Sequence, residues 1–367
     1  MRLNVQSKQH TYPIIFSNKG LSTFVDTLTE LQSVESVVLG CNETVLALYG
    51  KNLISDLESK GIVVHLLLVP DGEQYKNIKT YVELLQRLDQ LPIHRKTPFL
   101  ALGGGVTGDM VGFLASTYLR GVPFVQVPTT LLAMVDSSVG GKVGVNTAAG
   151  KNRVGAFYPP ILVFIAPEVL QTLPQEEWLC GFGEVVKHGA LLDPRIIEMC
   201  EDMASMIASS NVNSLENEWI NELVLRNCKV KRAVVEQDEH ERGARAMLNL
   251  GHTVGHAIES TLEHQIQHGV CVAWGLVMEL AWSVRQGCLS QQVLHRISTL
   301  ISNMGFPELP TEMPEETLHY FAKNDKKRDG KGFIPITRLR DLGKPELYSL
   351  SVHNIHQLFH PQKEISA

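Results

Sequence analysis

The sequence lacks the paired cysteines that hold structural zinc or carry out disulfide exchange. Its six cysteines are widely spaced and include no C-x-x-C pair: Cys41, Cys180, Cys200, Cys228, Cys271 and Cys288. Isolated cysteines of this kind are typical of reduced thiols, most of them buried. We therefore expect a protein of the reducing cytoplasm without a disulfide framework.

A surplus of positive charge and a long apolar run are also missing. The 33 Lys and Arg residues against 39 Asp and Glu residues leave a formal net charge of −6, which gives no general attraction to nucleic acid or anionic lipid. The N-terminal residues lack the apolar segment of a signal peptide, and the run from Val270 to Met278 ends at Glu279, short of the roughly 20 residues that span a bilayer. We expect no nucleic-acid partner and no membrane segment.

Length and patterning predict two domains. The 367 residues exceed the roughly 250 to 300 at which a single hydrophobic core stops growing. Short apolar runs alternate with helical periodicity in the first half, and strand patterns nearly vanish in the second. We expect an α/β Rossmann-like domain at 1–174 and an all-α domain at 175–367. The strands should cover 36–39, 62–69, 98–102, 123–127 and 161–165, with a helix within 78–91 and further helices within 178–287 and 290–304.

A glycine-rich segment, GGGVTGD at 103–109, follows one of the predicted strands. Gly103, Gly105 and Gly108 satisfy the pattern G-x-G-x-x-G at a strand-to-helix turn, where bare backbone and a helix N-terminus suit a pyrophosphate. No acidic residue stands about 20 residues downstream to hold a ribose. The alternative is a tight glycine turn packed on a helix.

The next segment is locally cationic. Lys142, Lys151 and Arg153 fall in a stretch from Ser137 to Pro167 that contains no acidic residue. Lysine ammonium groups near backbone amides suit a phosphorylated or carboxylated small molecule. A solvated basic loop is the alternative.

The second half contains candidate metal ligands. His252 and His256 are four residues apart on a predicted helix, so their imidazoles can converge on one ion. Glu184 belongs to another predicted helix, and a carboxylate with two imidazoles leaves open positions, as catalytic zinc requires. A hydrogen-bonded pair of core histidines is the alternative. Spacing does not choose among five histidines: His188, His252, His256, His264 and His268.

Taken together, the motifs resemble those of the 3-dehydroquinate synthases, a family of the sugar phosphate cyclases. The resemblance covers nearly the whole chain, through PDGEQYK at 70–76, GGGVTGD at 103–109, RGVPFVQVPTTLL at 120–132, VDSSVGGK at 135–142, GKNRVGAFYPP at 150–160, GEVVKHG at 183–189, LNLGHTVGHAIE at 248–259 and NDKK at 324–327. It implies that an N-terminal domain binds NAD, that a helical domain holds the metal, and that the active site lies in the cleft between them.

The resemblance also implies roles for individual residues. The metal ligands would be Glu184, His252 and His268, with zinc the expected ion and cobalt also suited. The catalytic residues would be Asp136, Lys142, Lys187, Asn249 and His256. Substrate would be bound by Arg120, Asn152, Lys231, Arg245 and Lys326. NAD would contact Asn42, Asp71, Gly72, Glu73, Gln74, Tyr75, Lys76, Gly104, Gly105, Val106, Thr107, Gly108, Asp109, Thr129, Thr130, Lys142, Lys151 and Thr172.

The activity implied is conversion of 3-deoxy-D-arabino-heptulosonate 7-phosphate into 3-dehydroquinate and phosphate, a shikimate-pathway step toward chorismate and the aromatic amino acids. It combines transient oxidation at C5 by NAD, β-elimination of phosphate, return of the hydride and an intramolecular aldol closure. The family also suggests a homodimer.

One position departs from the family pattern. The family commonly has Glu directly after the His-Gly of its last ligand motif, whereas here Val270 follows His268 and Gly269. A carboxylate close to a ligating histidine raises its basicity. We therefore expect an altered metal affinity with all three ligand positions retained.

Three other functions fit parts of the pattern. Another sugar phosphate cyclase, such as a 2-deoxy-scyllo-inosose synthase or a valiolone-type cyclase, would use the same chemistry on a different substrate. A metal-dependent polyol dehydrogenase would release NADH, and a non-catalytic metal-binding protein would release neither NADH nor phosphate. The set Lys142, Lys231, Arg245 and Lys326 favours a substrate with both a phosphate and a carboxylate.

Overall fold

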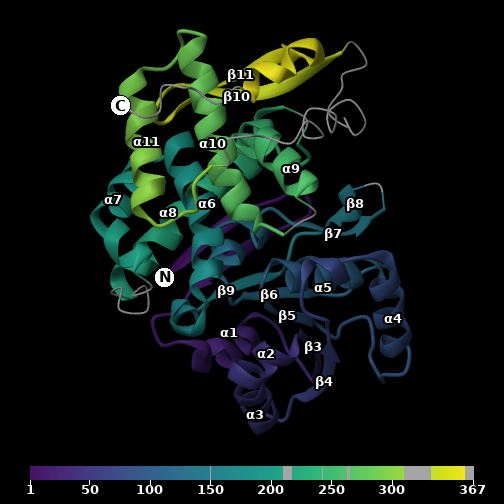
Figure 1. Cartoon of the computed structure of the whole chain (residues 1–367). Coiled ribbons are helices and arrows are strands. Elements are labelled where there is room, and N and C mark those ends of the chain that lie inside the picture. The colour runs from purple at the N-terminus through teal and green to yellow at the C-terminus, as the bar shows by residue number, and fades with distance from the viewer. Residues whose placement is uncertain (149, 210–216, 242, 263–264, 310–331, 360–367) are drawn as a thin grey trace. The chain divides into compact units, whose positions relative to one another are not determined.

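The computed structural model describes residues 1–148, 150–209, 217–241, 243–262, 265–309 and 332–359. The chain divides into two compact units, Met1–Leu173 and Pro174–Ala367, shown in Figure 1. None of the described helices combines the length and the apolar character needed to cross a bilayer.

The first unit is built on a seven-stranded sheet of order β1-β2-β9-β6-β5-β3-β4. Neighbouring strands are parallel except for the antiparallel pair β1 and β2. The five strands expected from apolar runs are all present, because continuous hydrophobic runs suit a sheet buried on both faces. The strands are β1 (Arg2–Gln6), β2 (Thr11–Phe16), β3 (Ser36–Cys41), β4 (Val63–Leu68), β5 (Phe99–Gly103), β6 (Phe124–Pro128) and β9 (Leu162–Ile165).

Two strands, β1 and β2, were not expected from the sequence. In β1 only Leu3 and Val5 are buried, in alternation with exposed polar residues. Such a short alternating pattern at the edge of a sheet gives a weak hydrophobic signal.

The helices of the first unit flank this sheet: α1 (Phe24–Leu31), α2 (Glu43–Val45), α3 (Lys51–Ser59), α4 (Ile78–Leu88) and α5 (Gly105–Thr117). The chain runs from β3 outward to β4 and then returns to the other side of β3 to form β5. Right-handed crossovers in opposite directions place their helices on opposite faces, and Figure 1 shows α3 and α5 on opposite sides of the strands. One core cluster includes Val38, Phe99, Met110 and Val111 from this arrangement.

The basic segment 142–157 is a β-hairpin and not a loop. Strand β7 (Lys142–Thr147) pairs antiparallel with β8 (Gly150–Phe157). Val143 and Val145 are buried in the core cluster of α4 and α5, while Lys142 is exposed at the start of the strand. The hairpin forms because these alternating valines bury one face and leave the cations on the other.

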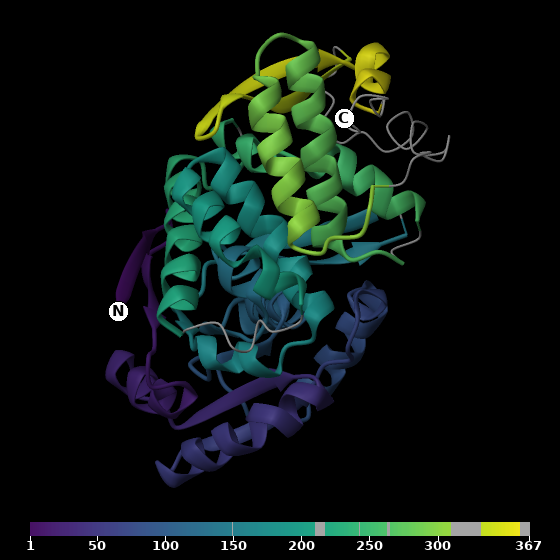
Figure 2. The ribbon, with the colours of Figure 1, turned by 60° about the vertical axis from the view of Figure 1, so that its left-hand side comes forward.

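The second unit is mainly helical, as expected. Its helices are α6 (Gln175–Leu191), α7 (Pro194–Ala208), α8 (Asn217–Gln237), α9 (His252–Thr261), α10 (His268–Arg285) and α11 (Gln291–Asn303). It also contains a hairpin of β10 (Phe333–Asp341) and β11 (Lys344–Ser351) that the all-α expectation did not include. Figure 2 shows α10 and α11 side by side, with this hairpin in yellow near one end of the pair.

The unexpected hairpin is anchored to the helical part by polar contacts. The Thr337 hydroxyl donates to the Ala246 carbonyl at 3.2 Å, and the Gly343 amide donates to the Ala190 carbonyl at 2.9 Å. Pro335 and the charged residues of β10 weaken the strand pattern in the sequence, which is why apolar periodicity alone did not predict it.

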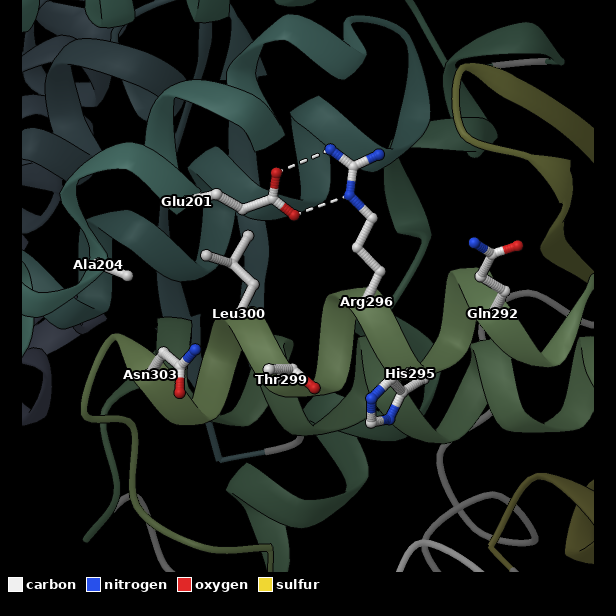
Figure 3. Close-up of a pocket in the computed structure, with 8 residues that line it drawn as sticks. All are labelled: Glu201, Ala204, Gln292, His295, Arg296, Thr299, Leu300 and Asn303. Atoms are coloured by element: carbon white, nitrogen blue, oxygen red, sulfur yellow. Dashed lines mark hydrogen bonds and ion pairs between the residues drawn. The ribbon is translucent and has the colours of Figure 1, made fainter.

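A surface pocket of about 350 Å³ lies between α7 and α11. Glu201 and Arg296 join the two helices there through two contacts of 2.7 Å each, drawn as dashed lines in Figure 3. None of the site residues expected from the sequence lines this pocket, so it is separate from the predicted active site.

Glycines bring three helices of the second unit together backbone to backbone. A Cβ at Gly183 on α6 would overlap the carbonyl oxygen of Gly269 on α10, and one at Gly269 would overlap that of Cys180. A Cβ at Gly275 on α10 would likewise overlap the carbonyl oxygen of Gly251, next to α9. Each of these glycines permits a helix separation that no other residue allows.

We expect Gly269→Ala to lower the free energy of unfolding by about 3 kcal/mol, because the added methyl meets backbone that has no rotamer to change. Urea denaturation followed by circular dichroism measures this. Gly287→Ala is the control, since a methyl there meets nothing within 4 Å and only the left-handed backbone costs about 1 to 2 kcal/mol. Equal losses in the two variants would contradict the close-approach explanation.

Candidate active site

The centre of the site in the second unit is the carboxylate of Glu184 on α6. It is fully buried, and neither of its oxygens accepts a well-aligned hydrogen bond. Lys187, one turn further along α6, forms an ion pair with it. The Nε2 atoms of His252 and His268 lie 3.2 Å and 3.4 Å from its Oε1 atom. Two imidazoles from two other helices therefore converge on one buried carboxylate.

The far side of each of these imidazoles faces a hydrogen-bond acceptor. The Nδ1 atom of His252 lies 3.3 Å from the Leu250 carbonyl oxygen, and that of His268 lies 3.5 Å from a carboxylate oxygen of Glu259. Because these oxygens only accept, each Nδ1 holds a proton, so that in its neutral form each ring directs the lone pair of Nε2 at Glu184. A buried carboxylate beside two such nitrogen atoms fits a divalent metal ion.

A third imidazole, that of His256, lies beside these two. Its ring centroid is 5.1 Å from that of His252 and 5.5 Å from that of His268, and nitrogen atoms of the three rings lie within 4.8 Å of one another. The convergence predicted from the spacing is therefore present. The assignment of His256 to the substrate side stays a prediction.

Of the two remaining histidines considered as ligands, His188 alone lies in the described part of the chain. His188 is buried on α6, and its Nδ1 atom lies 3.1 Å from the amide oxygen of Asn227. His264 lies outside the described residues, as does the predicted substrate residue Lys326.

The charges around the centre shift the pKa values of its members. Burial acts to raise the pKa of Glu184, but Lys187 and His252 outweigh it and hold that pKa well below its usual range. Burial lowers the pKa of His252. For His268, burial is opposed by the nearby carboxylates of Glu184 and Glu259, which raise its pKa to about 9. In the metal-free protein the site therefore holds a carboxylate, a neutral His252 and a protonated His268 at neutral pH.

In the first unit, most of the predicted NAD residues follow the carboxyl ends of four neighbouring parallel strands. Asn42 follows β3, the segment 71–76 follows β4, the segment 104–109 follows β5, and Thr129 and Thr130 follow β6. Strands β3 and β5 border the point where the chain reverses its direction across the sheet. In open α/β sheets, ligands bind outside the carboxyl ends of the strands at this switch point.

Polar contacts join these segments to one another. Lys76 forms a buried ion pair of 2.5 Å with Asp109 on α5. Glu73 accepts a hydrogen bond of 2.8 Å from the amide of Asn146 and lies 3.6 Å from the Lys151 ammonium. The hairpin β7–β8 is thus tied to the segment after β4, and Lys151 lies near the other predicted NAD residues.

The glycines of the turn after β5 have identifiable roles. A Cβ at Gly104 would lie 3.1 Å from the Thr130 side chain, and one at Gly108 would lie 2.8 Å from that of Gln126 on β6. Gly108 thus allows α5 to pack closely on the sheet. The turn joins β5 to the N-terminus of α5, the position that favours a phosphate.

Thr172 lies further along the first unit, in the 3₁₀ segment Pro167–Thr172. Its hydroxyl is 2.5 Å from that of Tyr49.

The predicted substrate residues include positions of uncommon backbone conformation. Four non-glycine residues in the described part of the chain have positive φ: Leu119, Arg120, Asn152 and Glu241. Arg120 and Asn152 belong to the predicted substrate set, and both are exposed. Conformations of this kind cost energy and gather at functional sites, which supports a binding role for both residues.

Glu241, in the second unit, is a residue that the sequence analysis did not single out. It has φ of 54°, and its carboxylate accepts a hydrogen bond of 3.2 Å from the predicted catalytic residue Asn249. The surrounding sequence was interpreted through its cations alone. A non-glycine residue with positive φ gives no signal in a single sequence, since Glu has no preference for that conformation.

Three predicted cationic residues of the second unit are buried: Lys187, Lys231 and Arg245. Arg245 donates a hydrogen bond of 2.6 Å to the Glu239 carbonyl, which orients its guanidinium. Desolvated cations are costly unless anionic groups compensate them, and for Lys187 the Glu184 carboxylate does so.

The comparisons with known proteins agree with this arrangement. Residues 66–180 match the model of the 3-dehydroquinate synthase N-terminal region, and residues 181–328 match that of the C-terminal region. A 3-dehydroquinate synthase of Geotalea uraniireducens (strain Rf4) is 42% identical over 330 residues, which are 89% of this chain and 90% of the relative. The chain belongs to the 3-dehydroquinate synthase family.

Solved structures of related cyclases confirm the fold class. A 2-epi-5-epi-valiolone synthase from Streptomyces hygroscopicus subsp. jinggangensis 5008, with NAD⁺ and Zn²⁺ bound, has a TM-score of 0.86 at 25% identity, covering 96% of this chain and 97% of that one. A 2-deoxy-scyllo-inosose synthase complexed with carbaglucose-6-phosphate, NAD⁺ and Co²⁺ has a TM-score of 0.87 at 24% identity, covering 98% and 99%. At 24% identity, the similarity to the 2-deoxy-scyllo-inosose synthase concerns the fold alone.

The surroundings of His268 include the one position at which the sequence departs from the family pattern. Val270, which stands where the family commonly has Glu, is buried in the first turn of α10. Glu259 on α9 supplies a carboxylate to the Nδ1 side of His268. The ligand therefore has an acidic partner, and the altered metal affinity expected from Val270 stays a prediction.

Zinc affinity of the metal-free protein should rise about tenfold per pH unit between pH 6.5 and 8.5 and level off above about pH 9. The reason is that zinc must displace the proton of His268, whose pKa is raised to about 9. Competition with a chromophoric chelator at several pH values measures the affinity. An affinity that levels off near pH 7 would contradict the raised pKa.

Glu259→Gln should weaken zinc binding by about 10- to 100-fold, because His268 loses the carboxylate that orients its ring and raises its basicity. The same chelator competition measures the loss. Glu198→Gln is the control, since Glu198 is an exposed residue of α7 paired with Arg195. Equal zinc affinities in the two variants would rule out a role for Glu259.

Proposed function

We propose that this chain converts 3-deoxy-D-arabino-heptulosonate 7-phosphate into 3-dehydroquinate and inorganic phosphate, a carbon–oxygen lyase reaction of the shikimate pathway. The observation that carries the proposal is the convergence of His252 and His268 on the buried carboxylate of Glu184 in a member of this family. Such a centre fits a reaction whose intermediates develop charge on oxygen.

We assign NAD binding to residues 1–174 and binding of the metal and much of the substrate to residues 175–367. In the first domain, NAD would be held by the segments that follow β3, β4, β5 and β6, with the pyrophosphate at the N-terminus of α5. In the second, Glu184, His252 and His268 would hold the divalent ion. When bound, NAD accepts and returns a hydride at C5, and the ion acts as a Lewis acid toward the C4 and C5 oxygens.

The remaining residues would bind and orient the substrate. Arg120, Asn152, Lys231, Arg245 and Lys326 would hold its phosphate and carboxylate, because ammonium and guanidinium groups provide charge-assisted hydrogen bonds to both. Asp136, Lys142, Lys187, Asn249 and His256 would lie close to the reacting carbons. The cations would also orient the phosphate so that one of its own oxygens takes the proton during elimination.

His256 is well placed for a role in handling the substrate. Its ring lies beside those of His252 and His268, and its side chain is partly exposed. It therefore combines proximity to the metal ligands with access for a bound molecule. We propose that it donates a hydrogen bond to the substrate.

A related cyclase activity is the main alternative. Valiolone-type and scyllo-inosose-type cyclases share this fold, but curated 3-dehydroquinate synthases are the relatives at about 40% identity over most of the chain. The cationic residues Lys142, Lys231, Arg245 and Lys326 also suit a substrate with two anionic groups. A polyol, the substrate of a dehydrogenase, is uncharged and offers no phosphate to such a set.

We further propose that the enzyme acts in the cytoplasm as a homodimer. The isolated cysteines support the first point, since most of the described thiols are buried and none is in a disulfide. The second is supported by the family resemblance alone.

The test is to incubate the purified protein with the heptulosonate phosphate, catalytic NAD and zinc, and to measure phosphate release. We expect phosphate in excess of NAD, lost after chelator treatment and restored by zinc. Folded, metal-replete protein that releases no phosphate would shift the assignment to another sugar phosphate. NADH accumulating stoichiometrically with product, or formed from polyols, would contradict the recycling of the cofactor.

A further inference from the structure

Helix α9 begins at the proposed ligand His252, and its N-cap residue provides no side-chain hydrogen bond to the helix. That residue, Gly251, has φ of 77° and ψ of −18°. A Cβ at Gly251 would lie 2.8 Å from the Val272 carbonyl oxygen and 3.0 Å from the Leu276 amide nitrogen. Backbone conformation and packing against α10 both require glycine there. The helix therefore cannot carry the Ser, Thr, Asp or Asn that ordinarily caps an N-terminus.

The missing cap is supplied from α10 by the carboxylate of Glu279. Its Oε1 atom accepts from the Val254 amide at 3.2 Å, and its Oε2 atom accepts from the Gly251 amide at 2.8 Å. Val254 is the third residue of α9, whose N–H an ordinary cap side chain would accept. Gly251 is the cap residue itself, whose N–H a capping-box glutamate would accept. One side chain from a neighbouring helix thus makes both bonds of a capping box.

Glu279 is also fully buried. An ionised carboxylate away from water is costly unless hydrogen bonds and nearby positive charge compensate it. The two amides provide the hydrogen bonds, and the positive end of the α9 dipole provides the charge. The carboxylate therefore fits this position better than an apolar side chain of similar size.

This cap joins the two helices that carry the proposed imidazole ligands. Helix α10 begins at His268 and contains Glu279, while α9 begins at His252. The close approach of Gly275 to Gly251 brings the same two segments together. The Leu250 carbonyl, which accepts from the His252 ring at 3.3 Å, also belongs to the segment that Glu279 holds. A shift of this segment would move the His252 Nε2 atom away from Glu184.

We propose that Glu279 is a positioning residue of the metal centre, acting through the backbone of residues 251–254 to hold His252 in place. This inference rests on the proposed function, because it takes His252 and His268 as metal ligands. Glu279 raises metal affinity by preorganising the ligand pair, over and above any contribution to the stability of the fold.

Glu279→Gln is the variant to make, because the amide keeps the shape of the side chain but has one acceptor oxygen instead of two and no charge. We expect the metal-free variant to bind zinc at least about tenfold more weakly than wild type, measured by chelator competition. We also expect the visible absorption bands of its Co²⁺-loaded form to shift, because these bands report the geometry of the ligands. NAD binding should stay unchanged.

Leu280→Ala is the matched control. Leu280 is the next residue of α10 and is fully buried, so its truncation lowers thermal stability through a cavity. We expect its zinc affinity to stay within twofold of wild type and its Co²⁺ spectrum to be unchanged. If Glu279→Gln does not fold, Glu279→Asp provides the same readouts, since it keeps the charge but is too short to reach both amides.

The outcomes separate this inference from the proposed function. Wild-type zinc affinity and an unshifted spectrum in a Glu279 variant of lowered thermal stability would show a purely structural cap and overturn the inference alone. Wild-type protein that binds neither zinc nor cobalt would overturn the proposed metal centre and this inference together.

Discussion

The ionised state of one buried carboxylate organises the second unit. Glu184 is fully enclosed, and a charge in that environment persists only with opposite charge or a metal ion beside it. Lys187 and two imidazoles lie against it, and the three helices that carry these groups are held together by glycines at their contacts. The helix packing and the centre therefore depend on each other.

In the first unit, the order of the parallel strands determines which segments lie near one another. The predicted NAD segments are distant in the sequence, yet each follows the carboxyl end of a parallel strand. The sheet brings them to one edge. Lys76 with Asp109, and Glu73 with Asn146, then tie the segments together locally.

The sequence predicted the features that depend on hydrophobic pattern or local spacing. Five of the seven strands of the sheet, helix α4 and the convergence of His252 with His256 follow from hydrophobic pattern and spacing. The strands β1, β2, β7, β8, β10 and β11 were missed, because strands with an alternating pattern, charges or prolines resemble loops. The choice of Glu184 as a ligand needed the family resemblance. Glu241 was missed because its positive φ leaves no signal in a single sequence, and Glu279 because its contacts are with the segment before and at the start of another helix.

The glycine contacts have a further consequence for how this site tolerates sequence change. At Gly183, Gly269 and Gly275 the neighbouring helix contributes backbone atoms, so no compensating substitution on the partner helix makes room for a methyl group. Most core positions accept exchange among apolar residues when a neighbour changes volume in return. These three positions do not accept such an exchange. The distances between the helices that carry the proposed ligands should therefore stay constant while apolar residues elsewhere in the core are exchanged.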